Sequence, residues 1–362
     1  MTTMIDDLSS LCVSGDSSIR QAIACIDQNT AKIALVVDDE NRLLNTITDG
    51  DVRRAVLAGT ELDAHVMLLQ DRKVTSGHHK QAVTAPVGCE TGVLLQLMRE
   101  HDVRQVPLVD EEQRVVGLVM FRELISSDKL PMQAVVMAGG SGTRLRPLTD
   151  RLPKPMVPVG GRPMLERIID QLREAGISKV VVTTHYKGEL ISQHFGDGHE
   201  FGVQISYVNE NQPMGTAGGL SQLELSDEPL LVINGDILTR VDFRAMLDFH
   251  SEYQAEMSVA VRQHDLQVPY GVVETDGARI VKILEKPTVR HFINAGIYLL
   301  NPAVSQLIPN EDSYDMPDLI NRLITDGRRV ISFPVREYWL DVGQHDDYRQ
   351  AEADLRAGKV KL

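Results

Sequence analysis

The stretch AVVMAGGSGTRLRPLTDRLPKPMVPV, residues 134–159, decides the fold of the larger part of this chain. It begins with five apolar residues, AVVMA, which are typical of a short buried strand, and these lead directly into a glycine-rich loop. Farther along, strand-like segments such as KVVVTTHY, residues 179–186, alternate with helical segments such as MLERIIDQLREAG, residues 164–176. This alternation predicts an α/β domain with a doubly wound sheet, whose ligands bind where the strands end.

The glycine loop excludes two common phosphate-binding motifs. A dinucleotide-binding loop has the pattern GxGxxG, yet Gly140 and Gly142 are followed by Leu145 instead of a third glycine. A P-loop has the pattern GxxxxGK[ST], and no lysine stands at the required position. Consecutive glycines nevertheless allow backbone N–H groups to approach a triphosphate, and Arg144 and Lys154 are spaced to hold its charge. The loop therefore predicts phosphate binding without fixing the reaction.

The full order GGxGTRLxPLTxxxxKPMxPVxxxPM resembles the signature of nucleotidyltransferases that make NDP-sugars, nearly residue by residue through Pro163-Met164. The resemblance extends over residues 132–362. It implies a Rossmann-like, GT-A-like mixed sheet. It also implies an enzyme that joins an NTP and a sugar-1-phosphate into an NDP-sugar, releases pyrophosphate, and uses Mg²⁺ as its cofactor.

The motifs that carry this resemblance supply the candidate site residues. INGD gives Asp236 and WLDVG gives Asp341, which resemble the two magnesium ligands of the family; with Arg144 and Lys154 they form the predicted catalytic set. The predicted nucleotide-binding residues, the last three from the loop MGTAGGL, are Ala138, Gly139, Gly140, Gly142, Thr143, Gly215, Thr216 and Ala217. The predicted sugar-phosphate-binding residues, from YGVVE, LEKP and INAGIY, are Gly271, Glu285, Lys286 and Asn294.

The chemistry of the reaction suits these residues. Asp236 and Asp341 each follow an apolar strand-like run, so we expect both at one edge of a parallel sheet. Two carboxylates, together with phosphate oxygens and water, are the ligands that octahedral Mg²⁺ takes. A sugar-1-phosphate oxygen is already an anionic nucleophile, so no general base is required. As alternatives, either aspartate could be a turn residue or a helix cap, and Asn294 could satisfy a backbone turn.

The first 130 residues contain a weak internal duplication at a constant offset of 72 residues, which places Val37-Asp38 on Val109-Asp110. Each copy is typical of a helix, a strand, a tight acidic turn, a strand and a helix. This pattern resembles a tandem of CBS domains, the Bateman module that senses adenine nucleotides and related ligands. We therefore predict CBS domain 1 at residues 1–65, CBS domain 2 at 66–128, a linker at 129–133 and the transferase domain at 134–362.

The CBS resemblance also implies a nucleotide site. The family places a Thr or Ser three residues before an Asp to contact a ribose, and Thr48 and Asp51 in the first copy fit this pattern. The second copy has Met120 and Glu123 instead, which puts its site in doubt. An adenine or guanine nucleotide is thus a possible effector. The alternatives are that Thr48 and Asp51 only cap a helix, and that the pair of domains is a structural dimerisation module without a ligand.

Composition limits the remaining classes of function. The net charge is −14 and no run of lysines and arginines is present, which disfavours nucleic-acid binding. Three scattered cysteines without CxxC spacing predict neither disulfides nor a zinc site. No apolar stretch approaches the ~20 residues of a membrane span, and MTTMIDDLSS is not the start of a signal peptide. We expect a soluble, cytoplasmic homo-oligomer without a membrane or nucleic-acid partner.

The fusion of both modules resembles a bacterial subset of guanylyltransferases that act on hexosamine- or mannose-1-phosphate. These enzymes feed surface-polysaccharide or nonulosonate synthesis, so the resemblance favours GTP by analogy. The alternative is a catalytically degenerate domain that senses sugar phosphates or nucleotides. The presence of both Asp236 and Asp341 speaks against it, because a sensor need not keep two metal ligands.

Overall fold

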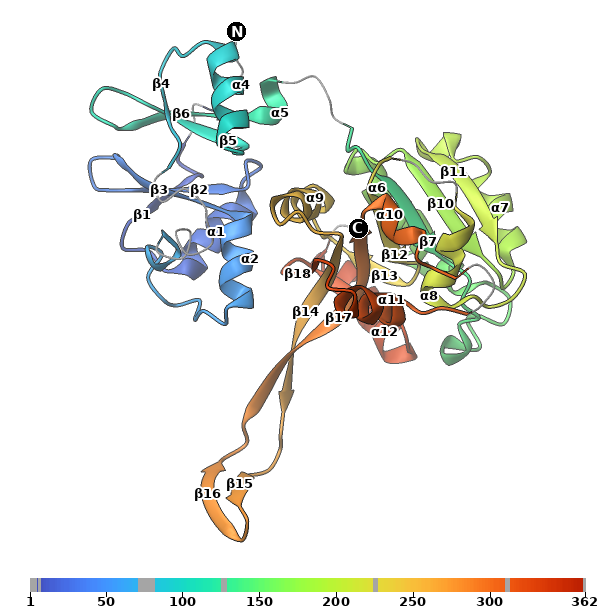
Figure 1. The fold of residues 1–362 in the computed structure, drawn as a ribbon. Coiled ribbons are helices and arrows are strands. Elements are labelled where there is room, and N and C mark those ends of the chain that lie inside the picture. Colours follow the sequence, from blue (N-terminus) through green and yellow to red (C-terminus); the bar gives the residue numbers. More distant parts are fainter. Residues whose placement is uncertain are drawn as a thin grey trace. The chain divides into compact units, whose positions relative to one another are not determined.

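A computed structural model describes residues 5, 8–70, 82–124, 129–223, 227–309 and 313–360. The chain divides into two compact units, Met1–Asp128 and Lys129–Leu362 (Figure 1). The segment expected as a linker, residues 129–133, differs from that expectation. Leu130 and Met132 are buried in the second unit, since their apolar side chains gain more by packing there than by standing in water.

The first unit contains the predicted duplication. The first copy consists of α1 (Ile19–Gln28), β2 (Ile33–Val37), β3 (Leu43–Thr48) and α2 (Asp49–Leu57). The second consists of α4 (Thr91–Glu100), β5 (Gln105–Val109), β6 (Val115–Met120) and α5 (Phe121–Leu124), each starting 72 residues after its counterpart. With β1 (Cys12–Ser14) and β4 (Ala85–Pro86) the strands form two three-stranded sheets, and both hairpins bulge at the same place. The repeat is therefore a repeat of structure.

The two copies share one core. Leu35 of the first copy packs with Leu118 and Met120 of the second, so each copy covers apolar surface that the other would expose. Val66 and Leu69, which lie just beyond the predicted end of the first domain, pack into the core of that first copy. Ile5, in contrast, pairs with Leu118 of the second copy.

The second unit is built on a seven-stranded sheet in the order β11-β10-β7-β12-β17-β14-β18. Its strands are β7 (Gln133–Met137), β10 (Lys179–Thr184), β11 (Gln204–Asn209), β12 (Leu230–Asn234), β14 (Met257–Gln267), β17 (Thr288–Leu300) and β18 (Val330–Pro334). Only β17 runs opposite to the others, because it pairs antiparallel with both β12 and β14. The predicted doubly wound mixed sheet is confirmed.

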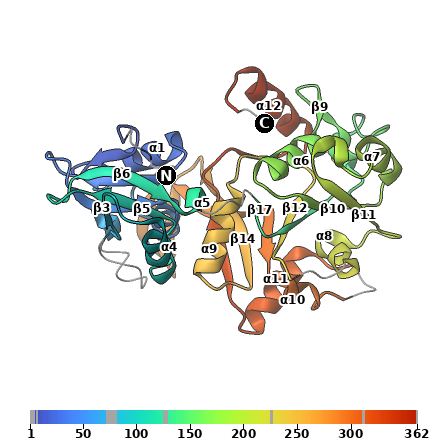
Figure 2. The ribbon, with the colours of Figure 1, turned by 90° about the horizontal axis from the view of Figure 1, so that it is seen from above.

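Helices cover both faces of this sheet (Figure 2). α6 (Met164–Glu174) and α7 (Gly188–Phe195) lie on one face; α8 (Gly215–Gly218), α10 (Pro302–Ser305) and α11 (Met316–Thr325) lie on the other. On the second face Leu319 and Leu323 of α11 pack with Val135 and Val232 of the central strands. The remaining helices are α9 (Phe243–Glu252), α12 (His345–Arg356) and the short 3₁₀ helices η1 (Thr143–Leu145), η2 (Lys154–Met156), η3 (His199–Phe201) and η4 (Gly219–Gln222).

Three small antiparallel sheets complete the second unit: β8 (Pro158–Val159) with β9 (Arg162–Pro163), β13 (Ile237–Thr239) with β19 (Trp339–Asp341), and β15 (Val272–Asp276) with β16 (Arg279–Leu284). The last pair forms the tip of a long projection, which we call the arm and define as residues 263–292. The arm contains the outer parts of β14 and β17, and in Figure 1 it stands out from the body of the second unit.

Candidate active site

The carboxyl end of the central sheet brings together the glycine loop, Lys154 and Asp236. Asp236 follows β12, and the Lys154 ammonium donates a hydrogen bond to its Oδ2. Gly142 has φ +63°, and a methyl group added there would lie 2.9 Å from Lys154 Cβ. Because this backbone is left-handed and the space is filled, glycine is required at the position. The loop is thereby packed directly against the lysine.

Asp341 lies at the same place, but the strand that carries it belongs to a separate small sheet, which the sequence did not reveal. Our expectation that both aspartates end strands of one parallel sheet was wrong for Asp341. It ends β19, which pairs antiparallel with β13 so that Asp341 stands opposite Ile237. The Val342 amide then donates to the Asp236 backbone carbonyl over 3.0 Å. Trp339 holds β19 in place, since its Nε1 donates to the Ala295 carbonyl over 2.8 Å.

The electrostatics of the two carboxylates suit a cation. The pKa of Asp341 is raised, first by desolvation from the surrounding atoms and then by the negative charge of Asp236. The positive charges of Lys154 and Arg144 act in the opposite direction. Two carboxylates that repel each other beside the glycine loop fit Mg²⁺. Within the described ranges no cluster of three or more His, Cys, Asp or Glu residues is present, so further ligands would come from phosphates and water.

Arg144, in η1, completes the predicted catalytic set. A methyl group added at Gly343 would lie 3.5 Å from Asp341 Oδ1 and 3.8 Å from Arg144 Nη1, so the carboxylate and the guanidinium flank this glycine. The structure therefore gathers Arg144, Lys154, Asp236 and Asp341 from four separate segments. Their catalytic roles stay a prediction, but the proximity that those roles require is present.

The glycine loop, which is the first predicted nucleotide loop, is partly exposed beside the four predicted catalytic residues. Ala138 is buried, and its amide donates to the Thr183 carbonyl over 2.9 Å, which anchors the start of the loop. Gly140 and Thr143 are exposed, and a methyl group added at Gly140 would meet no atom within 4 Å. This part of the loop is open to a ligand.

The second nucleotide loop is held by its own chain. The amide and hydroxyl of Thr216 donate to Asp315 Oδ1 over 2.8 and 3.1 Å, and the Ala217 amide donates to the Tyr314 carbonyl over 2.9 Å. Gly215 has φ +77°, and an added methyl would lie 2.7 Å from both residues 314 and 315. The amides of Thr216 and Ala217 and the Thr216 hydroxyl are thus bonded within the chain, and direct contact of these residues with a nucleotide stays a prediction.

Glu210 is a residue that the sequence reasoning missed. Its carboxylate is buried between the two loops: methyl groups added at Gly139 and Gly219 would lie 3.2 and 2.8 Å from its oxygens. The Met214 amide donates to Glu210 Oε2 over 3.3 Å, and burial raises the pKa of the carboxyl. The sequence signal was an acidic residue four positions before the loop MGTAGGL, which by itself also fits an ordinary turn.

The predicted sugar-phosphate residues are not brought together. Asn294 precedes Gly296 by two residues, and a methyl group added at Gly296 would lie 2.7 Å from Nδ2 of Asn234, which ends β12. The Asn294 side chain donates to the Tyr298 hydroxyl and accepts from the Gly296 amide. The other three lie on the arm, away from the body of the second unit (Figure 1): Gly271, Glu285 and Lys286. None of their described contacts reaches the aspartates.

A family model described as nucleotidyl transferase matches residues 133–358, which is more than half of the chain. The chain belongs to the nucleotidyl transferase family. A second model, that of the CBS domain, matches residues 4–58 and 78–129. Both resemblances inferred from the motifs are therefore confirmed.

Curated relatives of this nucleotidyl transferase differ in the substrates that their names give. A mannose-1-phosphate guanylyltransferase of Mycobacterium tuberculosis is 36% identical over 236 residues, which cover 63% of this chain and 65% of that protein. A UTP–glucose-1-phosphate uridylyltransferase of Synechocystis is 33% identical over 251 residues, which cover 64% and 65%. The chain thus spans about 65% of the length of these relatives.

A solved structure has the same fold. A putative glucose-1-phosphate thymidylyltransferase from Bacillus anthracis superposes with a TM-score of 0.52 at 25% identity. The match covers 64% of this chain and 97% of the other. In the described residues of the nucleotidyl transferase chain, none of the helices combines the length and apolar character that a membrane span requires.

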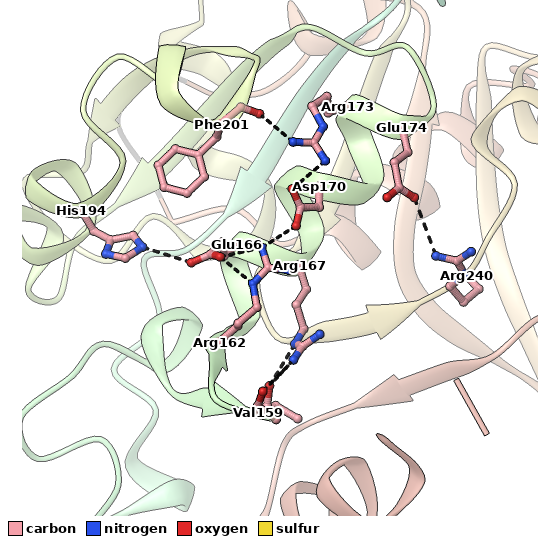
Figure 3. A network of polar contacts seen from close by, with 11 residues as sticks. Val159, Arg162, Glu166, Arg167, Asp170, Arg173, Glu174, His194, Phe201 and Arg240 are labelled. Atoms are coloured by element: carbon pink, nitrogen blue, oxygen red, sulfur yellow. Dashed lines mark hydrogen bonds and ion pairs between the residues drawn. The ribbon is translucent and has the colours of Figure 1, made fainter. Parts of the chain in front are cut away.

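A polar network on α6 supports the segment that carries Lys154 in this nucleotidyl transferase (Figure 3). Arg167 is buried, and its Nε and Nη2 donate to the Val159 carbonyl over 2.9 and 2.6 Å. Burial lowers the pKa of this guanidinium. Arg162, in β9, donates to Glu166 and Asp170 on α6. The network fixes the short β8–β9 hairpin, which directly follows η2.

We expect Arg167→Met to lower the free energy of unfolding by about 2 kcal/mol, because the buried Val159 carbonyl loses a charged donor. The control is Arg240→Met in the same network, since Arg240 contacts Glu174 only at 3.9 Å and both side chains are exposed. Urea unfolding of the two variants provides the measurement. Equal midpoints would show that Arg167 does not stabilise the segment.

In the first unit, Thr48 and Asp51 contact each other. The Thr48 amide and hydroxyl donate to Asp51 Oδ2 over 2.9 and 3.0 Å, and Arg54 donates to Oδ1 over 2.7 Å. Together they cap the start of α2, which is the alternative that the sequence left open. Met120 of the second copy is buried in the shared core. A nucleotide at Thr48 and Asp51 stays a prediction.

Proposed function

We propose that the second unit transfers a nucleotidyl group from an NTP to a sugar-1-phosphate. The observation that carries the proposal is the convergence of Arg144, Lys154, Asp236 and Asp341 beside an open glycine loop. The names of the two relatives described above each include a sugar-1-phosphate, which supports this class of substrate.

The reaction needs position and charge from the chain. A phosphate oxygen of the sugar-1-phosphate attacks the α-phosphorus of the NTP and forms a new P–O bond. The bond from the α-phosphorus to the oxygen that bridges to the β-phosphate breaks, and pyrophosphate leaves with that electron pair. Arg144 and Lys154 stand where they offset the repulsion between the two anions. No side chain has to remove a proton, because the attacking oxygen is already anionic.

Asp236 and Asp341 would hold Mg²⁺. The ion supplies positive charge to the phosphate groups of the NTP. The pair of Lys154 with Asp236 keeps the ammonium at the point where these phosphates would arrive. The glycine loop excludes side chains from the same space, since even a methyl group at Gly142 meets Lys154.

We favour GTP as the nucleotide and a hexosamine- or mannose-1-phosphate as the acceptor. The similarity to a mannose-1-phosphate guanylyltransferase supports this choice, while the similarity to a uridylyltransferase keeps UTP as the competitor. A matrix of five NTPs against a panel of sugar-1-phosphates, with pyrophosphate release as the readout, decides between them. Release with one GTP pair supports the proposal. No release with any pair would favour the alternative, a catalytically degenerate domain that senses sugar phosphates or nucleotides.

We further propose that the first unit binds an adenine or guanine nucleotide through Thr48 and Asp51. Isothermal titration of the full chain with AMP is expected to give heat that Asp51→Ala removes. Because this change also removes a helix cap worth about 1 kcal/mol, the variant is first shown to be folded by circular dichroism.

The matched control for this titration is Glu123→Ala, which changes the corresponding position of the second copy and should keep the heat. AMP, ATP and GTP are each titrated in turn. Because GTP can also bind the proposed transferase site, only heat that Asp51→Ala removes is counted. If no nucleotide gives such heat, the CBS pair is the structural module that the sequence offered as the alternative.

A further inference from the structure

The arm, residues 263–292, concentrates the exposed apolar side chains of the chain. Eight of the fourteen large hydrophobic residues that are exposed in the described ranges lie on it: Leu266, Tyr270, Val273, Ile280, Val281, Ile283, Val289 and Phe292. Scattered apolar residues on a surface need no explanation, but more than half of the exposed ones gathered on one projection are typical of an interaction site. The arm is therefore a candidate surface for a partner.

The backbone of the arm also lacks partners in the described chain. β18 pairs with β14 only over Met257–Val261, and β12 pairs with β17 only over Ile297–Leu300. Beyond these residues the arm is a two-stranded ribbon, and at its tip β15 and β16 pair only with each other among the described strands. Such a ribbon is marginal in water, and its open edges are templates for another chain.

The register gives the tip an apolar face. Val273 pairs with Ile283, and after a bulge Thr275 pairs with Ile280. Directly opposed residues of an antiparallel pair point to the same side, so these apolar side chains share one face. They are 47%, 61% and 58% exposed for Val273, Ile283 and Ile280.

The charges of the arm favour a second copy of this chain as the occupant. The arm has four acidic residues (Asp265, Glu274, Asp276, Glu285) and four basic ones (Arg279, Lys282, Lys286, Arg290), while the chain as a whole has a net charge of −14. Acidic bodies repel each other, whereas a neutral arm can approach an acidic body or an identical arm. Two identical arms related by two-fold symmetry can also pair their opposite charges with each other.

The position of the arm relates it to the active site. β17 pairs with β12 from Leu300 opposite Leu230 to Ile297 opposite Ile233, so the arm leaves the sheet at the edge where β12 ends and Asp236 follows. Thr288 lies six residues before Asn294 along β17, which is about 20 Å of extended strand. The paired ribbon thus holds its far end away from its own Asp236.

We propose that the arm packs against a second copy of this chain and brings Gly271, Glu285 and Lys286 to the active site of that copy. In a symmetric dimer both arms are exchanged, so each site combines the aspartates of one chain with Lys286 of the other. The role of Lys286 rests on the nucleotidyl transfer proposed above. The packing of the arm rests only on its exposed face, its open edges and its charge.

The first test is molar mass in solution, measured by sedimentation velocity. The wild-type chain is expected to contain at least two copies, and the double variant Ile280→Glu, Ile283→Glu should have half the wild-type mass. The control is Ile324→Glu on α11, which is 57% exposed and should leave the mass unchanged. A monomeric wild type, or a double variant of wild-type mass, would overturn the proposal.

The second test mixes two inactive variants, Lys286→Ala and Asp236→Asn, by co-expression. With exchanged arms, a mixed dimer contains one site that has both wild-type residues, so random pairing restores about a quarter of wild-type turnover. No recovery, or full activity of Lys286→Ala alone, would overturn the exchange. If the wild type itself has no turnover, nucleotidyl transfer fails, whereas the mass measurement still decides whether the arm is an interface.

Discussion

Replacement of either carboxylate by its amide, Asp236→Asn or Asp341→Asn, is expected to lower turnover by about a thousandfold or more while the protein stays folded. Each change keeps the shape of the side chain and removes one of the two negative charges that would hold Mg²⁺. The backbone contact from Val342 to the Asp236 carbonyl is untouched, so the local structure persists. Turnover at saturating substrate over a range of Mg²⁺ concentrations provides the measurement, with circular dichroism as the check of folding.

A matched control is Asp346→Asn at the start of α12. This aspartate lies five residues after Asp341, is exposed and pairs with Arg349. Its replacement should leave both turnover and the Mg²⁺ requirement unchanged. Wild-type rates in Asp236→Asn or Asp341→Asn would remove the metal site from the account.

The second large effect is expected for Lys154→Met, which should lower kcat/KM for the NTP by about a hundredfold or more. Lys154 is buried between the glycine loop and Asp236, and methionine fills a similar volume without the charge. The phosphates then meet an Asp236 whose negative charge is no longer balanced. Lys154→Arg should not restore activity, because Lys154 is buried and the planar guanidinium is larger than the ammonium it would replace.

The control for the lysine is Lys187→Met, since Lys187 is a surface residue that donates only to the Asp150 carbonyl in the described contacts. Initial rates at limiting NTP compare the two variants. An unchanged kcat/KM in Lys154→Met would mean that the lysine serves only to pair with Asp236.

The sequence predicted those features whose causes are local. The glycine loop could be predicted because Gly142 needs both a left-handed backbone and the absence of a side chain, and such demands select residue types directly. The CBS pair could be predicted because it is encoded twice, with strands and bulges at the same offset. The end of α6 was marked by Gly176, which has φ +85°.

The sequence could not predict features that depend on distant partners. Asp341 follows an apolar run, but only the pairing of β19 with β13 shows that it enters from a separate small sheet. The Glu210 carboxylate packs against glycines of two loops that are far apart in sequence. The length of the arm is set by where β12 and β18 stop pairing, which alternating residues in β14 and β17 do not reveal.

Phosphorus-31 NMR of the wild-type chain with Mg²⁺, an NTP and a sugar-1-phosphate tests nucleotidyl transfer most directly. It distinguishes attack by the sugar phosphate from attack by water, because each product has its own resonances. We expect equal amounts of pyrophosphate and of an NDP-sugar, with the sugar-phosphate signal consumed at the same rate. Formation of orthophosphate, or of a nucleoside monophosphate with the sugar phosphate left intact, would contradict it.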